Sequence, residues 1–99
     1  MTAVLFHRLA GRELKSANAW YQVRNTGVGS RFLAAIESAV MRIERDPDSL
    51  TVERKYFRAI RVHRFPSSQI FERYGTDQVL IFAVAPTSRR PGYWSRRKS

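Results

Sequence analysis

"RFLAAIESAVMRIER", residues 31–45, is the stretch of this 99-residue chain that most firmly sets its fold. Its apolar side chains recur every three or four residues, which places them on one face of an α-helix. The polar side chains Arg31, Glu37, Ser38 and Arg42 lie on the other sides. "DPDS" follows at 46–49, and a proline disfavours helical backbone in the residue before it. The sequence therefore predicts an amphipathic helix over residues 31–45.

A second helix is expected before this one, over residues 11–24. Its apolar side chains at i, i+3 and i+7 form one helical face: Leu14, Ala17 and Tyr21. The intervening "NTG" should end the first helix, because Gly27 can take a positive φ, and either Asn25 or Thr26 could cap the second. Two helices joined by so short a turn predict an antiparallel hairpin.

Strand-like segments flank the two helices. Residues 4–7 could form a short strand at an edge of the sheet. Between residues 56 and 65, apolar and basic side chains alternate, which is typical of a half-buried strand. Residues 69–74 favour a further strand, which the turn-forming residues 75–77 join as a hairpin to the strand at 79–85. This last run lacks polar alternation and predicts a central strand covered on both faces.

The element order is β-α-α-β-β-β, so the expected fold class is α+β, with an N-terminal helical hairpin packed on a small antiparallel sheet. Residues 1–99 should form one domain. The chain has no apolar run of 18 residues, no secretory signal and no cysteine. These absences argue against a membrane partner, a disulfide framework and a thiolate metal site. We expect a cytoplasmic protein with no metal and no other cofactor.

Charge is the strongest compositional signal. The formal net charge is +10. Residues 1–50 carry seven Lys or Arg against five Asp or Glu, whereas residues 51–99 carry eleven against three. Most of the cations are arginine, which favours bidentate contact with phosphate or carboxylate. This surplus indicates a nucleic acid, a nucleoprotein or an acidic protein as partner.

The C-terminal segment at 86–99 combines cations with aromatic rings, as a basic aromatic tail. Arg89 and Arg90 should meet a negatively charged target, together with Tyr93. Trp94 either packs back to fix the tail or stacks on that target. Because two prolines limit regular structure here, we expect the tail to add little to the core beyond Trp94.

Four pieces of the sequence resemble the RelE/ParE superfamily of toxins from type II toxin–antitoxin systems. They are "ELKSANAWY", "GSRFLAAIESAVMRIERDP", "RVHRFP" and "VLIFAVAPTSRRPGYW", and the resemblance extends over about residues 9–97. It implies a helical hairpin on a curved antiparallel sheet and a labile antitoxin with an acidic tail, encoded alongside. It also implies a target in translation or in DNA topology, because some members cleave mRNA on the ribosome and others poison DNA gyrase.

Cleavage of RNA through its 2′-hydroxyl needs a base, cations over the phosphate and an acid for the leaving oxygen. The candidates here are Arg58, Arg61, His63, Arg73, Arg89, Arg90 and Tyr93. Many relatives carry a histidine directly after the last strand, where this chain has Pro86, which cannot ionise. A set so rich in cations and so poor in acid–base groups favours gyrase poisoning.

The alternatives are a ribosome-dependent endoribonuclease and a toxin-fold protein that only binds its antitoxin. A nuclease would use Arg58, Arg61, His63, Arg89 and Tyr93. Target binding without chemistry would use Arg61, His63, Arg89, Arg90, Tyr93 and Trp94. Two interpretations stay open for Arg61 and His63, which form either a functional face or the solvated face of a half-buried strand. Trp20 and Tyr21 are expected in the core rather than at a partner.

Overall fold

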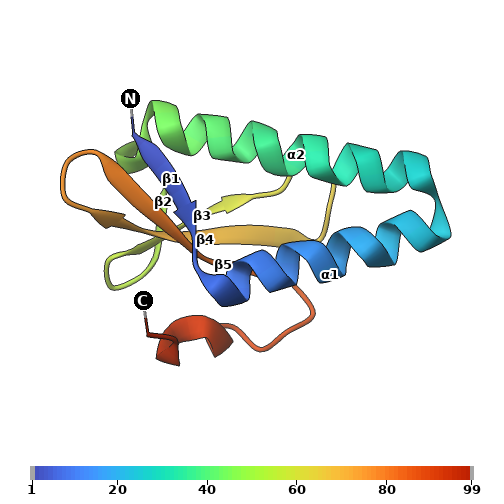
Figure 1. The fold of residues 1–99 in the computed structure, drawn as a ribbon. Helices are drawn as coiled ribbons and strands as arrows, with labels where there is room; N and C mark the ends of the chain where they lie inside the picture. The colour runs from blue at the N-terminus through green and yellow to red at the C-terminus, as the bar shows by residue number, and fades with distance from the viewer. Residues whose placement is uncertain (1, 99) are drawn as a thin grey trace.

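The computed structural model describes residues 2–98, which form a strand, a helical hairpin, four further strands and two short 3-10 helices (Figure 1). The elements are β1 Ala3–Phe6, α1 Arg8–Arg24, α2 Thr26–Arg45, η1 Pro47–Ser49, β2 Thr51–Arg54, β3 Phe57–Arg61, β4 Ser67–Tyr74, β5 Gln78–Pro86 and η2 Tyr93–Arg96. Met1 and Ser99, which end the predicted domain and tail, lie outside the described residues. The α+β class and the helical hairpin packed on a small sheet are confirmed.

Both helices begin earlier than their apolar periodicity predicts, because polar side chains cap them. The Leu9 N–H donates to His7 Nδ1 at 3.0 Å, so α1 starts three residues before position 11. At the hairpin turn, Asn25 Oδ1 accepts from the N–H groups of Gly27 and Val28, at 2.9 and 3.3 Å. Extended backbone at Asn25 makes the turn, so the expectation of a positive φ at Gly27 is wrong.

The sheet has the strand order β1-β5-β4-β3-β2. The prediction of an antiparallel sheet is wrong, because the sheet is mixed. β1 pairs with β5 in parallel, from Ala3 opposite Gln78 to Phe6 opposite Ile81. The other strand pairs are antiparallel. The chain leaves β1 through the helical hairpin and re-enters the sheet at its far edge. The β2–β4 meander then brings β5 alongside β1 in the same direction.

The strands differ from the prediction in three further respects. β2 was not predicted, because this edge strand is exposed at every position and has no buried face to produce alternation. β3 ends at residue 61 rather than 65, because the turn to β4 begins there and contains Arg64 at a φ of 68°. β5 is an interior strand, but β4 holds the middle of the sheet. The β4–β5 hairpin is as predicted, with Gly75 at a φ of 64° in its turn.

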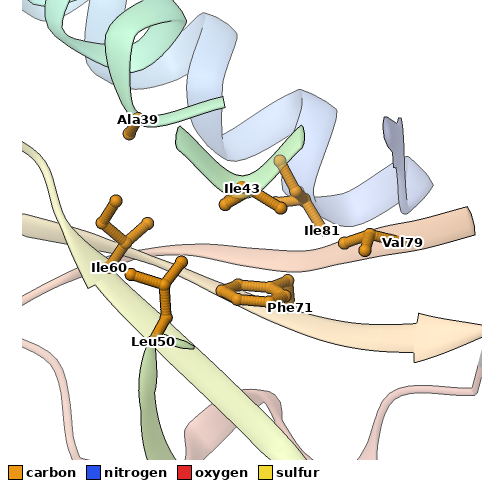
Figure 2. Close-up of a cluster of buried hydrophobic side chains, with 8 residues drawn as sticks. Ala39, Ile43, Leu50, Ile60, Phe71, Val79 and Ile81 are labelled. Carbon is orange, nitrogen blue, oxygen red and sulfur yellow. The ribbon is translucent and has the colours of Figure 1, made fainter. Parts of the chain in front are cut away.

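The helical hairpin covers one face of the sheet. Side chains from α2 and the strands form the cluster in Figure 2, which includes Ala39, Ile43, Leu50, Ile60, Phe71, Val79 and Ile81. A second cluster joins Phe32 and Ile36 of α2 to Val62 and Val84, with Tyr21 and Phe65 packed against it. Burying one such apolar side chain contributes about 1.5–3 kcal/mol to folding. This face therefore anchors both helices.

The tail covers the opposite face of the sheet. A β-bulge makes Ile70 pair with Ala83 and Phe71 pair with Ile81, which leaves Phe82 as the extra residue. Phe82 and Ala83 consequently both pack in the cluster that contains Trp94 of η2. The prediction that the strand at 79–85 is covered on both faces is confirmed.

Candidate functional site

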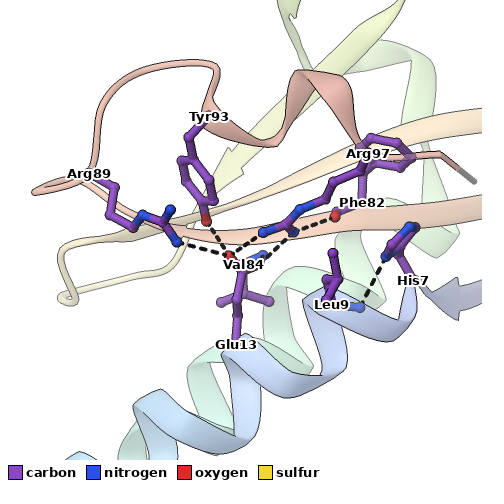
Figure 3. A network of polar contacts seen from close by, with 8 residues as sticks. All are labelled: His7, Leu9, Glu13, Phe82, Val84, Arg89, Tyr93 and Arg97. Atoms are coloured by element: carbon purple, nitrogen blue, oxygen red, sulfur yellow. Dashed lines mark hydrogen bonds and ion pairs between the residues drawn. The ribbon is translucent and has the colours of Figure 1, made fainter.

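An ion pair between α1 and the tail completes the edge of β5. β1 ends before the last part of β5, so backbone groups there have no strand partner. Val84 N–H donates to Glu13 Oε1 at 3.0 Å, and Arg97 Nη1 donates to the Phe82 carbonyl oxygen at 3.0 Å (Figure 3). A buried backbone group left without a partner costs about 1–3 kcal/mol. Glu13 and Arg97 thus supply the hydrogen bonds to β5 that a longer β1 would have made.

Glu13 is the centre of a cluster that we call the Glu13 cluster: Glu13, Arg89, Tyr93 and Arg97 (Figure 3). Arg97 binds both carboxylate oxygens, with Nη1–Oε1 at 2.9 Å and Nη2–Oε2 at 2.7 Å. The Tyr93 hydroxyl donates to Oε2, and Arg89 Nη1 lies 3.9 Å from the same oxygen. The Arg89 guanidinium stacks over the Tyr93 ring, 3.7 Å from its centroid. The side chains of Arg97 and Glu13 are only 12% and 16% exposed.

The charge states of this cluster follow from these contacts. Burial by itself would raise the pKa of Glu13, but hydrogen bonds from Arg97, Tyr93 and the Val84 N–H outweigh it and lower the pKa. Burial, and next its bond to Glu13, raise the pKa of Tyr93 well above its ordinary value. The bond to Glu13 raises the pKa of Arg97 further. At neutral pH the cluster therefore holds a carboxylate, a neutral phenol and two guanidinium ions.

A second contact ties the end of the tail to the start of α1. His7 Nδ1 accepts from the Leu9 N–H, so the ring's hydrogen lies on Nε2. His7 Nε2 lies 2.7 Å from the Lys98 carbonyl oxygen and donates to it. The same imidazole thus caps the helix and holds the tail.

The expectation that the tail adds little beyond Trp94 is wrong, because Tyr93 and Arg97 also anchor it. Neither Arg97 nor Glu13 was among the predicted site residues. A usable signal was present: Glu13 lies beside Leu14 and four residues before Ala17, on the apolar side of α1. A carboxylate placed there, in a chain with a net charge of +10, indicates a paired and partly buried acid.

The predicted tail residues occupy different environments. Trp94 is 3% exposed, and its ring centroid lies 4.9 Å from that of Phe57, so it packs back onto the sheet as one of its two predicted alternatives. Tyr93 is half-buried in the Glu13 cluster. Arg89 and Arg90 are exposed. The cations of the tail are therefore presented to solvent, whereas its indole is not.

The predicted strand residues do not form one cluster. Arg58 turns to the helix-covered side, where its Nη1 donates to the Leu50 carbonyl oxygen at 2.6 Å. Arg61 is exposed and shares its sheet face with Phe57, under the tail. His63 is exposed in the turn after β3, and Arg73 pairs with Asp48. Residues 58 and 61 differ by an odd number within one strand, so the sequence alone implied opposite faces.

A groove of about 670 Å³ runs between α1 and the start of the tail. We call it the α1 groove; its lining includes Arg12, Ala17, Trp20, Tyr21, Pro86 and Arg89. Trp20 is 53% exposed, so the expectation that it lies in the core is wrong, whereas Tyr21 packs against Phe32 and Phe65. The Arg24 guanidinium lies 3.5 Å from the centroid of the Trp20 ring. The groove thus combines an aromatic end with cations along its walls.

A smaller hollow of about 220 Å³ lies beneath the loop before η2. Its lining includes Glu53, Ala59, Ser68, Ala85 and Arg90. Arg58, Arg61 and His63 line neither this hollow nor the α1 groove. Among residues 2–98, no three His, Cys, Asp or Glu side chains gather as metal ligands would. No helix in the same part of the chain has the length and apolarity to cross a bilayer.

Comparisons with known proteins agree with this architecture. Residues 4–91 match the family described as ParE toxin of type II toxin-antitoxin system, parDE. A solved structure of the chromosomal ParDE TA system from P. aeruginosa superimposes with a TM-score of 0.74 at 18% sequence identity, covering 87% of this chain and 96% of that chain. No curated protein matches. The resemblance to the RelE/ParE superfamily is confirmed, and this chain belongs to the family of ParE toxins of type II toxin–antitoxin systems.

Proposed function

We propose that this ParE-family toxin arrests growth by poisoning DNA gyrase, and that an acidic antitoxin neutralises it. The observation that carries the choice of gyrase over mRNA is the state of the Glu13 cluster. Tyr93 donates its hydrogen bond to Glu13, and its pKa is raised, so the phenol stays protonated at neutral pH and cannot accept a proton from the 2′-hydroxyl. Glu13 already accepts bonds from Arg97, Tyr93 and the Val84 N–H.

The remaining acid–base candidate of the nuclease alternative is His63. This residue lies in the turn after β3 and lines neither cavity beside the tail. Within residues 2–98, no contact joins it to Arg89 or Tyr93. The arrangement supports a protein that binds its target through cations and performs no RNA cleavage of its own.

The test is controlled expression without any antitoxin, followed by incubation of purified protein with gyrase and supercoiled plasmid. We expect growth arrest, induction of the DNA-damage response and accumulation of gyrase–DNA cleavage complexes. Cleavage of translated mRNA, with protein synthesis stopping first, would instead support the endoribonuclease. Harmless overexpression would favour the protein that only binds its antitoxin.

The α1 groove is the proposed docking site of the antitoxin. Trp20 and Tyr21 offer an apolar end, and Arg12 and Arg89 offer cations to carboxylates. An amphipathic acidic segment matches both. Trp20→Ser should therefore keep the toxicity but abolish rescue by the antitoxin encoded alongside. Val23→Ser is the matched control, because Val23 is an apolar α1 residue that is 85% exposed and lies outside the groove.

A further inference from the structure

We propose that the tail-covered face of the sheet binds the phosphate backbone of duplex DNA directly. This face, which we call the basic face, carries five exposed arginines: Arg54, Arg61, Arg89, Arg90 and Arg96. The inference rests on the proposed function, since gyrase acts on duplex DNA. It adds that the toxin itself contacts the nucleic acid.

Three separate segments of the chain supply these cations to one surface. Arg54 of β2 reaches the tail: its Nη1 donates to Ser95 Oγ at 3.4 Å and would lie 2.9 Å from a Cβ added at Gly92. Arg61 of β3 pairs across the sheet with Ser68, which lines the hollow. Arg90 lines the same hollow. The tail loop and the sheet edge therefore present cations side by side.

The acidic residues only partly neutralise this face. Glu53 of β2 lines the hollow together with Arg90, and Glu72 lies on β4. Glu13 is occupied by Arg97. The acids Glu37, Glu44, Asp46 and Asp48 lie on α2 or directly after it, in the helical layer. The protein thus has a cationic surface on the side that its helices do not cover, which suits a polyanion.

The state of the tail aromatics favours duplex DNA over single-stranded RNA. Proteins that bind single strands stack bases on free aromatic planes. Trp94 is buried here, and the Tyr93 ring lies under the guanidinium of Arg89 with that of Arg97 nearby. What the tail offers to solvent is guanidinium groups, which suit phosphate contacts that are independent of sequence.

The same surface is a poor match for an acidic protein. Protein interfaces gain much of their affinity from exposed aromatic or aliphatic anchors. Apart from Tyr56 in the β2–β3 turn, the large apolar side chains of this face are buried beneath the tail, including Phe57, Ile70 and Phe82. The exposed indole of the molecule lies instead at the α1 groove. The two surfaces, which share Arg89, therefore fit two different partners.

The test measures binding of the full chain to a fluorescein-labelled duplex of about 20 base pairs, two helical turns, by anisotropy between about 50 and 200 mM salt. Arg61→Ala/Arg90→Ala should lower the slope of log K against log salt by about 1.8, which is about 0.9 for each lost phosphate contact. Arg31→Ala/Arg42→Ala removes the same charge from exposed positions of α2 and should leave the slope unchanged. Equal losses in both double variants would overturn the proposal, because binding would then follow net charge alone.

Single-stranded RNA of equal length provides the second arm. Tyr56, at the β2–β3 turn, is 63% exposed and offers an aromatic ring near the basic face. Tyr56→Ala should not change duplex affinity. Tighter binding of the RNA, lost in Tyr56→Ala, would overturn the assignment to duplex DNA.

The outcomes separate this inference from the proposed function. If gyrase–DNA cleavage complexes accumulate but no face-specific duplex binding is found, the gyrase proposal stands and the DNA contact fails. If duplex binding depends on Arg61 and Arg90 but no cleavage complexes form, the DNA contact stands and the gyrase proposal fails.

Discussion

Arg97 and Glu13 lie 84 residues apart in the chain and form a bidentate ion pair that holds the tail against α1 (Figure 3). The pair satisfies backbone groups of β5 that no strand reaches. The ion pair stabilises the position of the tail, and Glu13 also lies 3.9 Å from the exposed Arg89. The fold thus places a cation of the proposed target surface.

Glu13→Gln should lower the free energy of unfolding by about 3 kcal/mol, because it leaves Arg97 charged and largely buried without a counter-ion. Urea denaturation followed by circular dichroism measures the change. Glu37→Gln is the control, because Glu37 is exposed on α2, and it should stay within about 0.5 kcal/mol of the parent. Similar losses in the two variants would show that the ion pair contributes nothing specific.

Stability should fall as the pH drops below the ordinary Glu pKa of 4.5. The pKa of Glu13 is lowered in the folded protein, so the unfolded chain takes up the proton first on acidification. The stabilisation is therefore complete above the unfolded pKa and is lost as the pH falls through the folded one. Denaturation between about pH 3 and 6 should show this extra slope in the parent but not in Glu13→Gln. Asp48 and Glu72 also have shifted pKa values, but they occur in both proteins and cancel in the comparison.

Trp94→Ala should destabilise the protein by about 4 kcal/mol, because the indole is buried between the tail and the sheet. Trp94→Phe keeps an aromatic ring against Phe57 and should cost less. Thermal unfolding measures both. A melting temperature unchanged by Trp94→Ala would contradict the anchoring role and return the indole to the list of target contacts.

Arg89→Ala/Arg90→Ala should leave stability nearly unchanged while toxicity falls. Both side chains are exposed. The 3.9 Å contact between Arg89 and Glu13 should contribute about 0–1 kcal/mol, because Arg89 is solvent-exposed and Glu13 keeps its bonds to Arg97 and Tyr93. Losing two cations should weaken binding to a negatively charged target. Growth after induction, at matched protein levels, is the measurement. Full toxicity of this variant would move the target site to Arg61 and His63.

The sequence by itself determined the parts of this protein whose signals are local. The 3.6-residue periodicity of residues 31–45, the polar turn at Asn25 and the Gly75 turn between two apolar runs each lie within a few residues of what they specify. These signals were enough for the α+β class and both hairpins, and the quoted motifs were enough for the superfamily. The predicted helix starts were too late in the chain, because the capping residues lie outside the apolar periodicity.

Only the tertiary structure decided how distant segments meet. The parallel pairing of β1 with β5 depends on where the meander ends, and the residues of β1 contain no signal that predicts it. The role of Glu13 depends on β1 stopping short, since only then do the backbone groups of β5 need a carboxylate and a guanidinium. The burial of Trp94 depends on the bulge that turns Phe82 toward the tail. Each is a contact between segments far apart in the chain, whose geometry exists only once the sheet has formed.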